Sequence, residues 1–204
     1  MLLIGCNTLS AAATESLRKE FIGIPIFDII TPAVKKVIQE TKNKRVGIIG
    51  TRTTVVSGIY ERLIRQINPE IKVFSQSCPL LVPLVEENWL KKPETKTIVK
   101  KYLQPLKMKQ VDALVLGCSH YPFLEKIIQL KIGRKITLIN PGREAVLELK
   151  KFLEGNSTLE KSLVREGEHR FFVSDYTAHF QELGQKWLER PLKVELAEIS
   201  CKIG

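Results

Sequence analysis

The chain has 204 residues, of which 44% are hydrophobic and 7% aromatic, and its formal net charge at pH 7 is +10. This mix is typical of a globular protein with one large domain or two small ones. No apolar run is long enough to cross a bilayer and no signal-peptide pattern opens the chain, so no membrane association and a cytoplasmic location are expected.

The positive charge raises the question of nucleic acid. Lys and Arg are scattered through residues 35–45, 91–109 and 131–135, mostly at positions typical of polar helix faces or turns. No aromatic residues are interleaved with them, and no helix-turn-helix or zinc-finger pattern is present. We therefore expect no nucleic-acid partner, although the positive field would attract a small dianionic substrate.

Strands and helices alternate along almost the whole chain. Strands are expected at residues 1–4, 24–30, 45–50, 71–75, 111–116, 135–139, 169–174 and 193–199, and helices at residues 10–21, 31–41, 93–106, 123–130, 143–153 and 177–188. The first helix has an apolar stripe at Ala13, Leu17 and Phe21. Loops are expected at residues 78–89 and 155–167. The alternation predicts an α/β fold with mainly parallel sheets, whose ligands bind beyond the carboxyl ends of the strands.

Two of these strand ends carry the same pattern, Gly5-Cys6-Asn7-Thr8 and Gly117-Cys118-Ser119-His120. Backbone donors and the start of a helix at such a turn should lower the pKa of a thiol. Cys78 and Cys201 fit the core instead, and no cysteine spacing matches a zinc site, so no metal is predicted. A third strand end, at residues 50–54, has hydroxyl and N–H donors that could hold an anion or simply cap the next helix.

Three chemistries compete for the two thiols. A redox disulfide pair more often uses cysteines close in sequence. A Cys–His nucleophile would use Cys118 and His120 and would leave Cys6 without a role. A two-base proton exchanger uses one thiol on each face of a substrate carbon, and it alone explains why the motif occurs twice.

The two motifs and the segments between them resemble those of bacterial glutamate racemases. Residues 5–11 resemble the first cysteine motif, and residues 117–122 resemble the second, usually written Gly-Cys-Thr-His-Tyr-Pro, in which Ser119 keeps the hydroxyl. Residues 46–58 are similar to the middle strand and turn of the family, and residues 78–87 to its acidic loop. The related aspartate racemases share the architecture but usually lack the His-Tyr-Pro continuation.

This resemblance implies a cofactor-independent racemase that interconverts L- and D-glutamate and supplies D-glutamate for peptidoglycan. It assigns acid/base roles to Cys6 and Cys118 and substrate binding to Asn7, Thr8, Ser119 and His120, with His120 also tuning Cys118. It assigns auxiliary roles to Glu86, Thr51 and Thr54. Two alternatives remain: an aspartate or hydantoin-type racemase, and a non-catalytic racemase remnant with a binding or regulatory role.

The resemblance also implies the domain organisation. We expect two pseudo-symmetric three-layer domains, one formed by residues 32–141 and one, discontinuous, by residues 1–31 and 142–204. Family members have a strand ending in Asp-Ser-Gly and a Tyr-Gly turn before the first cysteine, and neither is found here. We therefore expect the discontinuous domain to be incomplete, racemase activity to be weak or absent, and the exposed sheet edge to favour association, for example as a homodimer.

Overall fold

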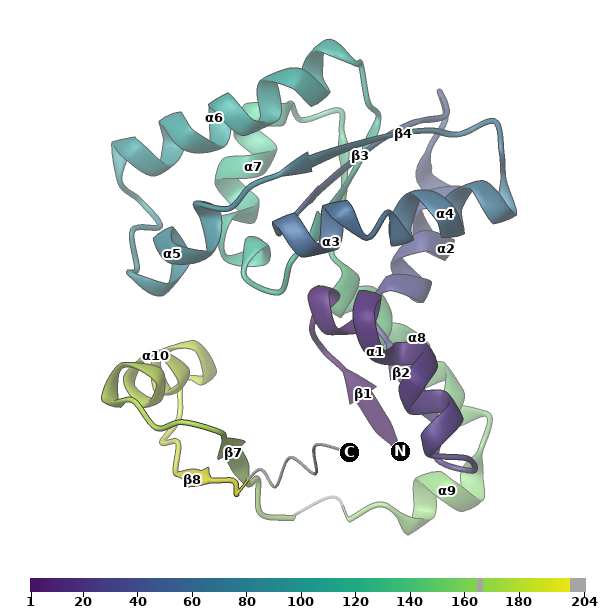
Figure 1. The fold of residues 1–204 in the computed structure, drawn as a ribbon, viewed down its shortest axis with the longest axis vertical. Coiled ribbons are helices and arrows are strands. Elements are labelled where there is room, and N and C mark those ends of the chain that lie inside the picture. Colours follow the sequence, from purple (N-terminus) through teal and green to yellow (C-terminus); the bar gives the residue numbers. More distant parts are fainter. Residues whose placement is uncertain (165–166, 199–204) are drawn as a thin grey trace, which may run out of the picture. The chain divides into compact units, whose positions relative to one another are not determined.

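The computed structural model describes residues 1–164 and 167–198, so Cys201 lies outside the described residues. The chain divides into two compact units, Met1–Ser157 and Thr158–Gly204. All of the predicted site residues belong to the first unit, which contains most of the elements drawn in Figure 1.

The first unit alternates strands with helices. Its strands are β1 (Leu2–Ile4), β2 (Ile26–Asp28), β3 (Arg45–Gly50), β4 (Lys72–Ser77), β5 (Ala113–Gly117) and β6 (Thr137–Ile139). Its helices are α1 (Asn7–Glu20), α2 (Ile30–Glu40), α3 (Arg52–Val56), α4 (Ile59–Ile67), α5 (Leu81–Glu86), α6 (Pro93–Met108), the 3-10 turn η1 (Tyr121–Leu124), α7 (Glu125–Ile132) and α8 (Pro141–Glu154).

The larger sheet of this unit has four parallel strands in the order β4-β3-β5-β6. β1 and β2 form a separate parallel pair. The prediction of an α/β fold with parallel sheets is therefore confirmed. β5 is buried along its whole length and β3 along all but its first residue, which explains why both are almost continuous runs of apolar residues.

Helices cover both faces of the four-stranded sheet (Figure 1). On one face, Val46, Ile48 and Val115 belong to a buried hydrophobic cluster that includes residues of α2 and α4. On the other face, Gly47 lies against α6, where an added Cβ would meet Leu106 Cδ1 at 3.3 Å. This sheet is therefore the middle of three layers.

Helix α1 turns a polar side inward. Asn7, Ser10 and Thr14 are buried, whereas Phe21, which was predicted on the buried stripe, is 46% exposed. The prediction is wrong for Phe21 because small hydroxyl residues make the inner face instead. Ser10 donates a hydrogen bond to the Ile4 carbonyl and Thr14 donates to the Ser10 carbonyl, so both side chains can be buried without losing their partners.

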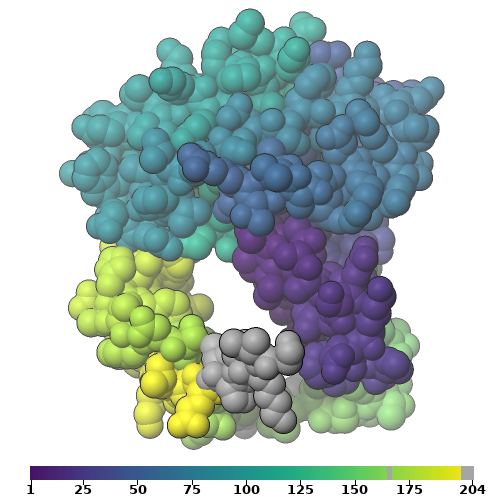
Figure 2. All heavy atoms as spheres, in the orientation of Figure 1, coloured from purple at the N-terminus to yellow at the C-terminus, as the bar shows by residue number. Residues whose placement is uncertain are grey.

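β1 is less enclosed than the strands of the large sheet. Leu2 and Leu3 are each 40% exposed, and among the described residues β1 pairs only with β2. Figure 2 shows the N-terminal residues, in purple, at the surface. The strand that leads to Cys6 is therefore held by fewer contacts than β5, which leads to Cys118.

The chain contains further helices between the elements expected from the sequence. Residues 81–86 form helix α5 instead of a loop, because Pro83 falls in its first turn, where a missing N–H costs no hydrogen bond. α3 and α4 are separate helices, divided by Gly58 at φ +61°. Residues expected to form a polar connector contain α9 (Ser157–Ser162).

The second unit holds the parallel pair β7 (Phe171–Val173) and β8 (Val194–Leu196) and helix α10 (Ala178–Leu188). Arg170 and Glu195 form an ion pair at 2.6 Å beside this pair of strands. The division into residues 32–141 and a discontinuous second domain stays a prediction. Across residues 1–164 and 167–198, none of the helices has the length and apolar character needed to cross a membrane.

Candidate active site

The candidate site begins at the carboxyl ends of β3 and β5. These strands are neighbours, and Gly50 is paired with Gly117, so Thr51 and Cys118 follow at adjacent strand ends. Gly117 allows this close approach, because a Cβ there would lie 2.6 Å from the Ile49 carbonyl oxygen. The glycine before the second thiol is therefore a steric requirement of the sheet.

Cys118 is enclosed, with only 6% of its surface exposed. Burial raises the pKa of its thiol; hydrogen bonds from the backbone of His120 and Tyr121 act in the opposite direction, and the charges of Cys6 and Glu86 add to the rise. The expected lowering is wrong for Cys118, because desolvation outweighs the backbone donors and the chain continues into the single turn η1.

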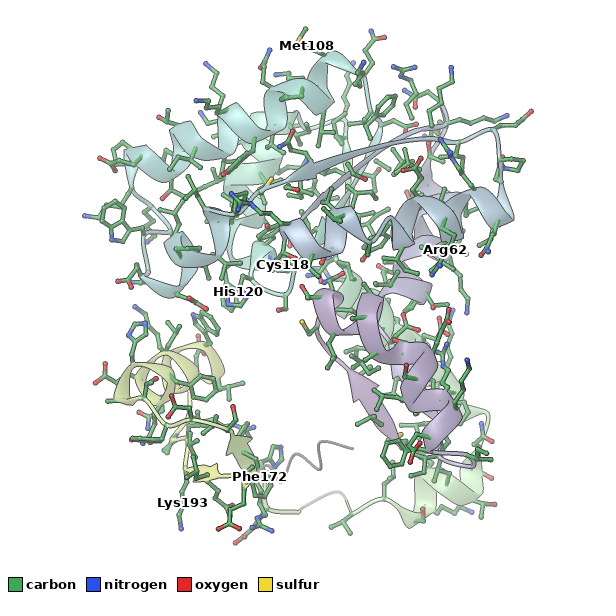
Figure 3. All side chains as sticks on the ribbon, in the orientation of Figure 1. Arg62, Met108, Cys118, His120, Phe172 and Lys193 are labelled. Carbon is green, nitrogen blue, oxygen red and sulfur yellow. The ribbon has the colours of Figure 1, made fainter. Side chains whose placement is uncertain are left out.

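A line of side chains links this thiol to a carboxylate. Cys118 Sγ lies 3.8 Å from His120 Nδ1, and His120 Nε2 lies 3.2 Å from Glu86 Oε1. Figure 3 labels Cys118 and His120 close together at one edge of the first unit. A carboxylate that accepts the Nε2 proton holds the imidazole in the tautomer whose Nδ1 can take up a proton from the thiol. The structure thus brings together Cys118, His120 and Glu86 as predicted.

Cys6 occupies the equivalent place at the end of β1. It is exposed and is the N-cap residue of α1, with Asn7 and Thr8 in the first turn. Asn7 is buried, and its Oδ1 accepts a hydrogen bond of 2.6 Å from the Tyr60 hydroxyl. The first thiol is therefore accessible while its neighbour is fixed within the protein.

Three threonine hydroxyls connect the segment after β1 with the turn after β3. Thr8 Oγ1 lies 3.0 Å from Thr51 Oγ1 and 3.3 Å from Thr54 Oγ1, and the latter two are 3.0 Å apart. Thr51 also caps α3 by accepting from the Thr54 N–H. Both functions proposed for residues 50–54 from the sequence are therefore compatible, since the turn caps a helix and also presents hydroxyls beside the Cys6 segment.

Two site residues behave differently from the rest. Ser119 is exposed and has no side-chain hydrogen bond within the described ranges. Tyr60 was missed by sequence reasoning, because a tyrosine in a helix that packs on the core is more often a core residue than a site residue. The nearest sequence feature was the Ser57-Gly58 pair before α4, which predicts a turn and does not indicate a role for Tyr60.

Cys78 is a further thiol of the first unit, besides Cys6 and Cys118. Cys78 is fully buried, and burial raises its pKa to about 12. Its carbonyl accepts a hydrogen bond of 3.0 Å from the Tyr121 hydroxyl. This confirms the interpretation of Cys78 as a core residue.

The chain is similar to known proteins along most of its length. A family model described as Asp/Glu/Hydantoin racemase matches residues 1–149. The glutamate racemase of Streptococcus sanguinis is 40% identical over 198 residues, which are 96% of this chain and 73% of the relative. The glutamate racemase of Syntrophus aciditrophicus is 37% identical over 94% of this chain and 70% of its own length.

The structural match is equally broad. The crystal structure of a Francisella tularensis glutamate racemase in complex with D-glutamate has a TM-score of 0.86 and 32% identity, covering 98% of this chain and 73% of that protein. The family model spans both cysteine motifs and the segments between them. The chain therefore belongs to the Asp/Glu/hydantoin racemase family and is an amino-acid racemase of the glutamate racemase type.

Proposed function

We propose that this chain interconverts L- and D-glutamate by a two-thiol proton transfer that uses Cys6 and Cys118 and needs no cofactor. The observation that supports the proposal is that the Cys6 segment contacts the end of β3, through 3.0 Å between the Thr8 and Thr51 hydroxyls, and that β3 pairs with β5, which leads to Cys118. Glutamate is favoured as the substrate because the relatives of 37% and 40% identity are glutamate racemases.

The proposed step conserves protons and electrons. One thiolate takes the α-proton of the amino acid, and the electron pair of the broken C–H bond stays on the α-carbon. The opposing thiol then delivers its proton to the other face, which inverts the stereocentre and leaves the two sulfurs with exchanged protonation states. The reverse direction uses the same two groups in exchanged roles.

His120 would accept the proton of the Cys118 thiol, and Glu86 would support His120 in this role. The thiol is enclosed and its pKa is raised by burial, so it needs a nearby base to become the thiolate that removes the α-proton. His120 Nδ1 lies 3.8 Å from the sulfur and can serve as that base. Glu86, 3.2 Å from the opposite ring nitrogen, would stabilise the imidazolium that results.

The remaining predicted residues suit the recognition of carboxylates. The hydroxyls of Thr8, Thr51 and Thr54 lie within 3.3 Å of one another and could rotate to donate to a substrate carboxylate. Ser119 and Asn7 flank the two thiols and add a further hydroxyl and an amide. Because the α-proton is only weakly acidic, donors in this position would also stabilise the charge that develops on the α-carbon and carboxylate.

The test is exchange of the α-hydrogen in D2O with D-glutamate or L-glutamate as substrate, followed by chiral chromatography and mass spectrometry. We expect the inverted product to carry one solvent deuterium from the first turnover, and Cys6→Ser and Cys118→Ser each to abolish inversion. Cys78→Ala is the matched control, because Cys78 is fully buried and takes no part in the step. Inversion that survives either active-site substitution would refute the two-thiol proposal.

We further propose that turnover by these 204 residues is low, since the strand that delivers Cys6 has two leucines that are each 40% exposed. Turnover comparable with that of the Streptococcus sanguinis racemase would contradict this expectation. A chain that inverts aspartate or a hydantoin but not glutamate would favour the alternative substrates. Binding of glutamate without any exchange of the α-hydrogen would favour a non-catalytic role.

A further inference from the structure

The strongest unassigned feature beside the site is the hydrogen bond between Tyr60 and Asn7. Tyr60 lies in α4, is 2% exposed, and belongs to the hydrophobic cluster under the large sheet. Its hydroxyl donates to Asn7 Oδ1 at 2.6 Å across a sequence separation of 53 residues. The bond therefore fastens the first turn of α1 to a helix that is anchored in the core.

Asn7 depends on this bond for its burial. The residue is 2% exposed, and its Nδ2 is the only buried side-chain nitrogen or oxygen without a partner in the described part of the chain. The Tyr60 hydroxyl is thus the one side-chain partner that the Asn7 amide has there. Without it, both polar ends of an enclosed amide would lack a partner, and the amide would gain by turning out toward water.

The consequence reaches Cys6, because Asn7 is its immediate neighbour. Cys6 is exposed, and its carbonyl accepts the first helical hydrogen bond of α1, from the Ser10 N–H at 2.8 Å. On the other side of Asn7, Thr8 is tied to Thr51. The thiol-bearing segment is therefore held through its neighbours, and the Tyr60 bond acts on the residue directly after Cys6.

We propose that Tyr60 is a positioning residue that holds the Cys6 segment in place through Asn7. Its importance for turnover rests on the proposed function, whereas its hold on the segment does not. Burial, together with the negative charge of Asp28, raises the pKa of Tyr60 well above its usual value, so the hydroxyl keeps its proton and remains a donor throughout the neutral and mildly alkaline range.

The first test is amide hydrogen exchange on Tyr60→Phe, which removes the hydroxyl and keeps the ring. We expect exchange at the Ser10 N–H, which reports the first turn of α1, to become about tenfold faster. The Phe21 N–H, which bonds to the Leu17 carbonyl at the other end of α1, should change much less. Equal exchange at Ser10 in the wild type and the variant would overturn the proposal.

Thr95→Val is the matched control for a loss of stability alone. Thr95 is fully buried in α6 and donates a hydrogen bond of 2.7 Å to the Trp89 carbonyl, so this substitution also deletes one buried hydroxyl bond but leaves α1 untouched. We expect it to lower the melting temperature without the local change at Ser10. A Thr95→Val variant with the same acceleration at Ser10 would show a general effect of stability and overturn the positioning role.

Steady-state kinetics with D-glutamate form the second test. Misplacement of Cys6 should lower kcat of Tyr60→Phe about tenfold, with a smaller change in KM through the released Asn7 amide. If the wild type inverts glutamate and Tyr60→Phe has the same kcat, the role in turnover is refuted although the proposed function stands. If the wild type neither inverts nor exchanges glutamate, the proposed function fails, and the exchange at Ser10 still decides whether Tyr60 holds the segment.

Discussion

Replacing Gly117 with alanine should destabilise the first unit and displace Cys118. The added Cβ would lie 2.6 Å from the Ile49 carbonyl oxygen, which belongs to the backbone of the neighbouring strand and cannot rotate away. β3 and β5 would have to separate by several tenths of an ångström at the pair Gly50–Gly117. Overpacking of this kind costs about 1–3 kcal/mol, and we expect the upper half of that range because backbone is involved.

The loss in the free energy of unfolding can be measured by urea titration with circular dichroism as the signal. With an m-value of about 2 kcal/mol/M, a loss of about 2 kcal/mol lowers the midpoint by about 1 M. Gly5→Ala is the matched control, because Gly5 precedes Cys6 in the same motif but has no atom within 4 Å of an added Cβ and no positive φ. Gly117→Ala with a wild-type midpoint, or Gly5→Ala with an equal loss, would refute the steric argument.

Three more substitutions test other residues of the first unit. Thr54 is 2% exposed, and Thr54→Val removes its hydroxyl, which contacts those of Thr8 and Thr51. The substitution should lower the free energy of unfolding by about 1–2 kcal/mol in the same urea assay. Glu86→Gln should lower kcat by about two- to fivefold, a small effect because the Glu86–His120 pair is partly exposed; a loss of a hundredfold would give Glu86 a larger role. Cys78 has a pKa raised from 9.0 to about 12, so its neutral form is favoured by folding and stability should fall as pH rises above 9. Cys78→Ala should reduce that slope between pH 9 and 10.5 in thermal melts, and an unchanged slope would contradict the assignment.

The parts of the fold that were predicted correctly from the sequence are those in which burial alone decides the pattern of apolar residues. The boundaries of β3 match the expected residues 45–50 because the strand is buried on both sides and ends at a charged residue and a turn. α1 shows the limit of the same reasoning. Its apolar residues were assigned to the core, yet Ser10 and Thr14 are buried because backbone carbonyls within reach satisfy their hydroxyls, and that arrangement depends on three-dimensional neighbours.

The candidate site divides in the same way. Cys118 and His120 belong to one local motif, the resemblance to glutamate racemases added Glu86, and the structure places His120 beside both of the others. Tyr60 could not be found, because its role arises from a contact between helices that are far apart in sequence. The direction of the Cys118 pKa was also missed, since a strand-to-helix turn reveals the donors but not the degree of burial.

The two motifs share a sequence pattern but place their thiols in different surroundings. Cys118 is enclosed beside a histidine and a carboxylate, whereas Cys6 is exposed at the end of a strand with exposed leucines. In a racemase this asymmetry cannot favour one direction in kcat/KM, because the enantiomers have equal free energies in water and the ratio of the two values is fixed at equilibrium. Unequal thiols can therefore make kcat differ between the two directions only if KM differs by the same factor, through the free energies of the enzyme-bound states. Equal kcat values for both directions at every pH would mean that the substrate, once bound, removes the difference between the two thiols.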